Sequence, residues 1–191
     1  MPLSSNQQKL CCKKLSPSYV NRYRTLALLL LFLSNVLYCP RTFTQSPSAT
    51  ARLTIKGDVE KPLSLSVEDV RQLPRKTLQV TNPHDKKEET YEGVLVTELL
   101  KRAGVPLGAQ LRGAAMATYV QADAGDGYRV VFSLAELDAD FQDSDVIVAD
   151  MMDGAPLDDK VGPFRLVPPR DKRPARWVRM LQSLTVVQIP K

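Results

Sequence analysis

The alternation of apolar and polar residues predicts a series of short β-strands in the part of the chain that follows residue 50. Every second side chain is apolar in these segments, which is typical of a strand with one buried face. Glycine, proline and aspartate interrupt the pattern at intervals and indicate turns. Strands are predicted at residues 51–56, 63–65, 77–81, 114–121, 128–132, 145–149, 164–167 and 181–189.

The helices are predicted to be few and short. Ser66 and Ser133 are each followed three positions later by an acidic residue, a spacing that indicates a capped helix start. A third helix is expected over residues 97–103, with Gly104 just beyond its end, and the polar residues 82–90 predict a loop. Many strands with two or three short helices define an α+β fold with mixed β-sheets.

The first 51 residues differ from the rest in charge and in hydrophobicity. They hold six basic residues and no acidic one, and their apolar run at residues 26–33 is extended by residues 36–38. This run is shorter than the roughly 20 apolar residues of a transmembrane helix, and a small-residue stretch, Ala49-Thr50-Ala51, follows it as a cleavage signal does. We therefore expect a signal peptide and tether at residues 1–51, a folded domain at residues 52–191, and export to the periplasm or cell envelope. The alternative is an uncleaved anchor or a lipid on Cys39, either of which places the domain at a membrane.

Removing the predicted leader changes the charge of the chain. The whole sequence has 26 basic and 21 acidic residues, and without the six basic residues of the leader it keeps 20 and 21, a net charge of −1. This balance excludes bulk electrostatic attraction to nucleic acid. All three cysteines, Cys11, Cys12 and Cys39, lie in the leader. The predicted domain therefore has no thiolate for a disulfide, a zinc site or nucleophilic catalysis.

A basic segment after Pro168-Pro169 is the clearest candidate for chemistry. Five basic residues surround Trp177, the only tryptophan, and they are Arg170, Lys172, Arg173, Arg176 and Arg179. One interpretation is an anion clamp, because guanidinium forks suit phosphate or carboxylate and the indole offers a stacking face. The other is a solvated basic loop with Trp177 in the core. His84, the only histidine, is either a ligand contact at the mouth of the predicted loop or an ordinary turn residue.

Several segments, taken in chain order, resemble the family of oxidoreductase molybdopterin-binding domains, which has the fold of sulfite oxidase. The resemblance covers nearly all of residues 52–190. Its most specific parts are residues 148–150, 153–157 and 162–168, and residues 91–94 and 172–178 are similar to further family segments. The resemblance implies a sulfite oxidase-like α+β fold with a cleft for molybdopterin.

The chain departs from the family at the position that binds the metal. In catalytic members a strand ending in Thr-Leu-Gln runs into a cysteine whose sulfur binds molybdenum, and here that position is Val80. The family's next motif, Gly-Asn-Arg, is replaced by Thr81-Asn82-Pro83, in which only Asn82 agrees. We therefore predict no catalytic residue, no metal ligand and no resident cofactor, although the resemblance keeps molybdopterin as a possible ligand.

Two functions follow from these observations. The first is a non-redox binding module for a small anionic ligand or an envelope partner protein, with Asn82, His84, Arg170, Lys172, Arg173 and Arg176 as the binding residues. The second is a molybdopterin-dependent oxidoreductase that holds its cofactor without a cysteine ligand. A structural envelope protein without a ligand is a third alternative.

Overall fold

The computed structural model describes residues 51–82, 85–143 and 145–190. The predicted leader, its cysteines and His84 lie outside the described residues. Leader cleavage, lipidation of Cys39, the domain boundary and export therefore stay predictions. Within the described ranges, no helix has the length and apolar character that crossing a membrane requires.

The first of two β-sheets is mixed and joins the first and last strands of the fold. Its strands lie in the order β2-β1-β10-β5-β6, and only the β1–β10 pair is parallel. The parallel pair sets Thr54 opposite Ser183. The strand bounds are Arg52–Gly57 for β1, Leu63–Ser66 for β2, Thr118–Ala124 for β5, Arg129–Ser133 for β6 and Leu181–Gln188 for β10.

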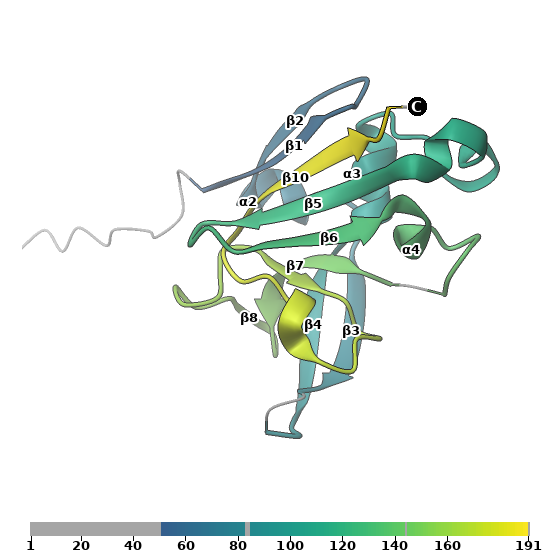
Figure 1. The fold of residues 1–191 in the computed structure, drawn as a ribbon. Helices are drawn as coiled ribbons and strands as arrows, with labels where there is room; N and C mark the ends of the chain where they lie inside the picture. Colours follow the sequence, from purple (N-terminus) through teal and green to yellow (C-terminus); the bar gives the residue numbers. More distant parts are fainter. Residues whose placement is uncertain (1–50, 83–84, 144, 191) are drawn as a thin grey trace, which may run out of the picture. The chain divides into compact units, whose positions relative to one another are not determined.

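The second sheet is antiparallel and carries the strands that surround the candidate site. Its order is β3-β4-β7-β8. The strand β9 pairs with residues 147–149 of β7, next to the part of β7 that pairs with β8 and on the edge away from β4. Figure 1 shows these strands running steeply across those of the first sheet, below β6. Their bounds are Lys76–Thr81 for β3, Glu88–Leu95 for β4, Ile147–Met152 for β7, Ala155–Pro156 for β8 and Arg165–Val167 for β9.

The helices are short, as the sequence predicts. The segments α2 (Val67–Arg71) and α4 (Leu134–Leu137) both begin with the expected capping box, in which the serine hydroxyl and the acidic side chain three residues on satisfy each other's backbone N–H groups. The helix α3 (Val96–Arg102) lies on the far side of the first sheet in Figure 1. Three 3₁₀ turns complete the described helices: η1 (Gly108–Gln110), η2 (Gly113–Ala117) and η3 (Pro174–Arg176). The α+β prediction is confirmed.

Two element predictions need correction. Residues 88–90, predicted as the end of a loop, belong to the long strand β4, which is paired by β3 on one side and β7 on the other. Residues 88–90 pair with Thr81, Val80 and Gln79 of β3, while the pairing with β7 begins at Tyr91. Pairing with β3 satisfies backbone groups of this glutamate-rich segment, so its polar sequence does not prevent a strand. The strand predicted from residue 114 begins at Thr118, because residues 113–117 form η2.

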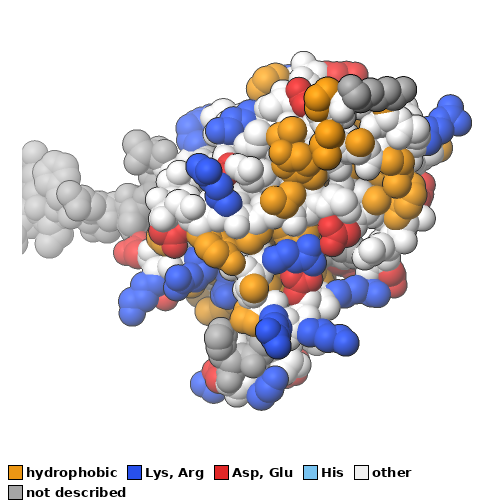
Figure 2. All heavy atoms as spheres, viewed as in Figure 1, with side chains coloured by type: hydrophobic (Ala, Val, Ile, Leu, Met, Phe, Trp, Pro, Cys, Tyr) orange, Lys and Arg blue, Asp and Glu red, His pale blue; other side chains and the backbone are white. Residues whose placement is uncertain are grey.

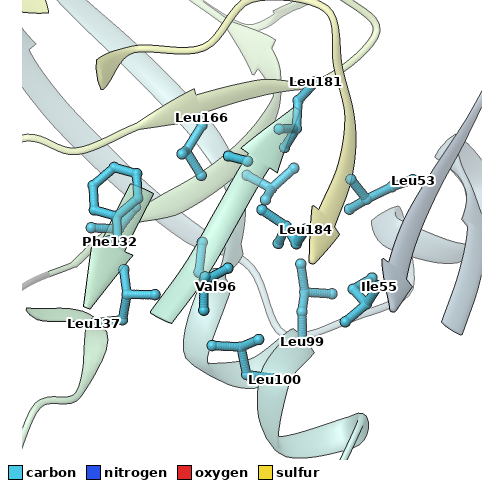
Figure 3. Packing of buried hydrophobic residues seen from close by; sticks show 14 of the residues in the cluster. Leu53, Ile55, Val96, Leu99, Leu100, Phe132, Leu137, Leu166, Leu181 and Leu184 are labelled. Atoms are coloured by element: carbon cyan, nitrogen blue, oxygen red, sulfur yellow. The ribbon is translucent and has the colours of Figure 1, made fainter. Parts of the chain in front are cut away.

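The main hydrophobic core fills the space between the inner face of the first sheet and α3. Leu53 and Ile55 of β1 and Leu99 and Leu100 of α3 are each 0% exposed. Figure 3 shows them packing with side chains from β6, β9 and β10. None of the residues of this cluster lines the candidate site, although Leu166 of the cluster directly follows the lining residue Arg165 in β9. The cluster therefore forms the support on which the site is built.

A smaller second core lies against the second sheet. Its buried residues are Val80, Tyr91, Ile147, Ala149, Val167 and Trp177. A buried ion pair ties α2 to this sheet, because the side chain of Asp150 is 0% exposed and contacts Arg71 at 2.9 Å and Arg75 at 2.6 Å. If α2 moved and Arg71 left Asp150, the buried carboxylate would lose one of its two cationic partners. This cost holds α2 in position against the second sheet.

A side chain at Gly93 is expected to force β4 and β7 apart. A Cβ atom placed there would lie 2.1 Å from the Val148 carbonyl oxygen and 2.6 Å from the Ala149 Cα, and these backbone atoms cannot rotate away. We expect Gly93→Ala to lower the free energy of unfolding by about 2–4 kcal/mol, measured by urea denaturation followed by circular dichroism. Gly125→Ala is the matched control, because its nearest neighbour is the mobile end of the Gln182 side chain. Equal losses in the two variants would contradict the close-approach argument.

Candidate functional site

A cavity of about 540 Å³ lies where the second core meets the turn between β5 and β6. It is built from segments that are far apart in the chain: the residue after β3, the β5–β6 turn, β9, and the stretch from η3 to Arg179. Its lining residues are Asn82, Asp126, Tyr128, Val161, Arg165, Pro174, Ala175, Trp177 and Arg179. Two arginines and one acidic residue face this space, so the lining favours an anion over a cation.

Arg165 is the central residue of the cavity wall. Its guanidinium carbon lies 5.2 Å from the ring centroid of Tyr91 and 5.2 Å from that of Trp177. The two rings are edge to face, with centroids 6.0 Å apart and an interplanar angle of 88°. A cation near aromatic faces is attracted by the ring quadrupole, and the attraction grows when water is excluded. Tyr91 and Trp177 of the second core therefore stabilise the positive charge of Arg165 beside them.

One donor of Arg165 has no acceptor among the described residues. Its Nη1 donates to the Tyr91 hydroxyl at 2.5 Å, but its Nε is buried without a hydrogen-bond partner. A buried donor that makes no hydrogen bond costs about 1–3 kcal/mol. Because Arg165 lines the cavity, an anionic oxygen is the kind of atom that would satisfy this donor.

A hydrogen-bond network behind the cavity fixes Asn82. Its Nδ2 donates to Glu89 Oε1 at 2.7 Å, and the Tyr91 hydroxyl donates to Glu89 Oε2 at 2.8 Å. Burial, with the hydrogen bond to Glu89 as a second cause, raises the pKa of Tyr91 above its usual range, while Arg165 opposes the shift. The phenol is therefore neutral at neutral pH and can donate to Glu89 while it accepts from Arg165.

Val80 closes the position at which the family's cysteine would bind the metal. Its side chain is 7% exposed and packs in the second core with Tyr91 and Trp177, and it does not line the cavity. No group of three or more histidine, cysteine or acidic side chains in the described part of the chain could hold a metal ion. The donors that are present therefore suit an anion, and they do not suit a metal that needs a thiolate from the protein.

The structure places the four basic residues of the predicted clamp outside the cavity lining, although Arg170 and Arg176 together line a smaller pocket of about 40 Å³. Arg176 forms a two-bond ion pair with Asp171 at 2.8 and 2.7 Å, contacts Glu136 at 3.0 Å, and lies 4.4 Å from the centroid of the Phe132 ring. The hydrogen bonds that Arg176 donates to Asp171 raise the pKa of Arg176 further above its already high value. Burial opposes ionisation of Glu136, but hydrogen bonds from Ser133 and Arg176 together leave its pKa below the usual value. The charge of Arg176 thus joins η3 to α4.

The other predicted residues lie in different surroundings. Arg170 pairs with Asp143 at 2.7 Å, whereas Lys172 and Arg173 are exposed and form no ion pair with any residue that the structure describes. Of the six predicted binding residues, Asn82 lines the cavity, His84 is outside the described residues, and the four basic ones are not among the lining residues. Trp177 is buried, and its Nε1 donates to the Pro168 carbonyl at 3.1 Å. That Arg170, Lys172, Arg173 and Arg176 bind an anion stays a prediction.

The sequence analysis missed Arg165 as a site residue and gave Arg179 no role of its own. An arginine inside a short strand ordinarily indicates an outward-facing charge, and nothing in the local sequence shows that two aromatic rings will cover it. The one available signal was the position of Arg165 inside residues 162–168, a segment that most resembles the family.

The chain belongs to the family of oxidoreductase molybdopterin-binding domains, whose match covers residues 41–191. A solved structure, that of the sulfane dehydrogenase SoxCD from Paracoccus pantotrophus, is similar with a TM-score of 0.56 and 23% sequence identity. The similarity covers 71% of this chain and 38% of that chain, so this chain spans well under half of that relative's length. At this identity the likeness concerns the fold alone. Together the matches confirm the family and the sulfite oxidase-like fold predicted from the sequence. None of the curated proteins matches the chain in sequence.

Removing the Tyr91 hydroxyl is expected to change how stability depends on alkaline pH. Because burial raises the pKa of Tyr91 in the folded state, the unfolded chain ionises this phenol first, from its usual value of 10.0 upward. Its contribution to stability is complete below pH 10 and is lost as the pH rises toward the folded-state pKa. Above pH 10, wild type should lose stability faster than Tyr91→Phe, by up to about 1.4 kcal/mol per pH unit.

Denaturant unfolding at a series of pH values from neutral to about 11.5 measures this difference. Tyr128→Phe, which removes a phenol that is 47% exposed, is the control for loss of a surface hydroxyl. Stability curves of wild type and Tyr91→Phe that stay parallel through the alkaline range would contradict the assignment.

Proposed function

We propose that the chain is an exported, non-redox binding module that holds a small anion in the cavity between Arg165 and Arg179. The observation that carries this proposal is Arg165, a residue that lines the cavity and whose buried Nε has no acceptor among the described residues. A protein that keeps such a donor buried loses free energy unless a ligand supplies the acceptor. Export rests on the sequence of the predicted leader.

The chemistry of the cavity favours a compact oxyanion or a ligand that carries one. Arg165 offers a planar fork in a partly desolvated position, and Arg179 adds an exposed cation that pairs with no acidic residue in the described ranges. Trp177 supplies an apolar wall. The volume of about 540 Å³ is in the range of small-molecule sites.

A molybdopterin-dependent oxidoreductase is the second candidate, and membership of the family is the observation that favours it. The pterin part of that cofactor is a planar anionic group that Arg165 and Arg179 suit chemically. The metal is not suited, because Val80 presents a hydrocarbon side chain to a closed core. Metal analysis and pterin fluorescence of protein purified from its native envelope separate the two candidates, and stoichiometric molybdenum would overturn the non-redox proposal.

Substituting the two cavity arginines is expected to weaken anion binding. Titration calorimetry with sulfate as the probe should show the dissociation constant rising about 10- to 100-fold in Arg165→Gln and in Arg179→Gln, because each loses charge-assisted hydrogen bonds of roughly 1.5–3 kcal/mol. Arg179 is exposed, so its variant tests binding even if Arg165→Gln disturbs the second core.

Arg170→Gln is the matched control for the loss of one positive charge, because Arg170 is exposed, pairs with Asp143 and does not line the cavity. Its sulfate affinity should equal that of wild type within about twofold. A sulfate affinity that none of the three substitutions changes, or that all three change equally, would refute the cavity as the binding site.

A further inference from the structure

Three exposed cations belong to the segment that contributes Pro174, Ala175, Trp177 and Arg179 to the cavity lining, and we call them the basic rim: Lys172, Arg173 and Arg179. Arg179 lines the cavity, and Arg173 directly precedes Pro174, which also lines it. None of the three forms an ion pair with a residue in the described ranges. Figure 2 shows Lys and Arg side chains gathered over the part of this face where Figure 1 draws η3 and the lower strands.

The basic rim forms no ion pair with described residues, whereas two other arginines of the same segment are paired. Arg170 is paired with Asp143, and Arg176 is enclosed by Asp171 and Glu136. The domain after the predicted leader has 20 basic and 21 acidic residues, so acidic side chains are abundant elsewhere. Like charges that lie close together without counter-ions raise the local potential and attract an acidic surface. The segment therefore uses two cations to hold its own fold and leaves three for an external partner.

An aromatic side chain completes this surface. Tyr128 is 47% exposed, lines the cavity, and donates its hydroxyl to the Ala175 carbonyl at 2.5 Å. The hydrogen bond joins the β5–β6 turn to η3, so the ring is held at the mouth of the cavity. Tyrosine and arginine are the residue types enriched at the centres of protein interfaces.

We propose that the basic rim docks an acidic segment of a partner protein, with one carboxylate of that segment entering the cavity toward Arg165. The inference rests on the proposed function and specifies its ligand as the side chain of a bound polypeptide. A single carboxylate suits the guanidinium of Arg165, which lines the cavity and forms no ion pair in the described ranges, and its flanking acidic residues suit the three exposed cations of the basic rim. Nucleic acid is disfavoured because three rim cations on a domain of net charge −1 neutralise few phosphates.

The test compares a peptide with a small anion on the same protein. A fluorescently labelled hexaglutamate peptide is titrated with the purified full chain, and anisotropy reports binding; sulfate affinity is measured in parallel by calorimetry. We expect Lys172→Gln/Arg173→Gln to weaken peptide binding about 3- to 10-fold, since each exposed charge contributes modestly. The same double variant should leave sulfate affinity within about twofold of wild type. Arg165→Gln should weaken both.

A charge-matched control is available on another part of the surface. Lys56 and Arg112 are exposed, lie outside the cavity and form no ion pair within the described ranges, so Lys56→Gln/Arg112→Gln removes the same charge. Peptide binding should be at least threefold tighter in this control than in the rim variant. If both double variants weakened peptide binding equally, the change in net charge alone would explain the effect, and the inference would be overturned.

The remaining outcomes separate the inference from the proposed function. Sulfate binding without peptide binding would overturn the inference and leave the anion cavity in place. Absence of both would overturn the proposed function itself. A single-stranded oligonucleotide of similar charge that binds more tightly than the peptide would replace the acidic protein partner by a nucleic acid.

Discussion

The candidate site depends on one interaction, the placement of the Arg165 cation between the rings of Tyr91 and Trp177. An isolated buried charge is costly, and the two aromatic faces together with the Tyr91 hydroxyl offset much of that cost. This contact joins β4 and β9, which lie on either side of β7 in the second sheet, to Trp177 just after η3, which belongs to no strand. The Tyr91 hydroxyl accepts a hydrogen bond from Nη1 of Arg165, but no described residue accepts one from its Nε. The contact that stabilises the second core therefore leaves one hydrogen-bond donor of Arg165 unsatisfied.

The division into two hydrophobic clusters explains how a site can change while the fold stays. The main core is largely aliphatic, with Phe132 and Phe164 as its aromatic members, and is made chiefly by the first sheet and α3. The second core contains Tyr91 and Trp177, the two aromatic residues that contact Arg165 in the cavity wall. Substitutions in the second core therefore act mainly on the site, whereas the parallel β1–β10 pair and α3 support the domain independently of it.

Local sequence signals predicted much of the fold, and contacts distant in the chain account for what they missed. The capping boxes at Ser66 and Ser133 depend on residues three positions apart, so their geometry is visible in the sequence. The start of β4 at Glu88 was missed because pairing with β3, rather than the local sequence pattern, decides its conformation. The role of Arg176 depends on Glu136, which is 40 residues away. A run of arginines and lysines cannot show which of them will be neutralised by such distant partners.

The loss of the metal-binding thiolate and the retention of a cationic pocket are compatible for a physical reason. Val80 contributes hydrocarbon to a closed cluster, where a thiolate would be desolvated and its pKa would rise. Placing a cysteine back at position 80 would therefore put a neutral thiol in the core, away from the cavity lining. The arginine is not affected by this change, because its surroundings are set by Tyr91 and Trp177 and not by a metal. The hydrophobic packing of Val80 and the cationic wall at Arg165 are therefore compatible in one domain of this family.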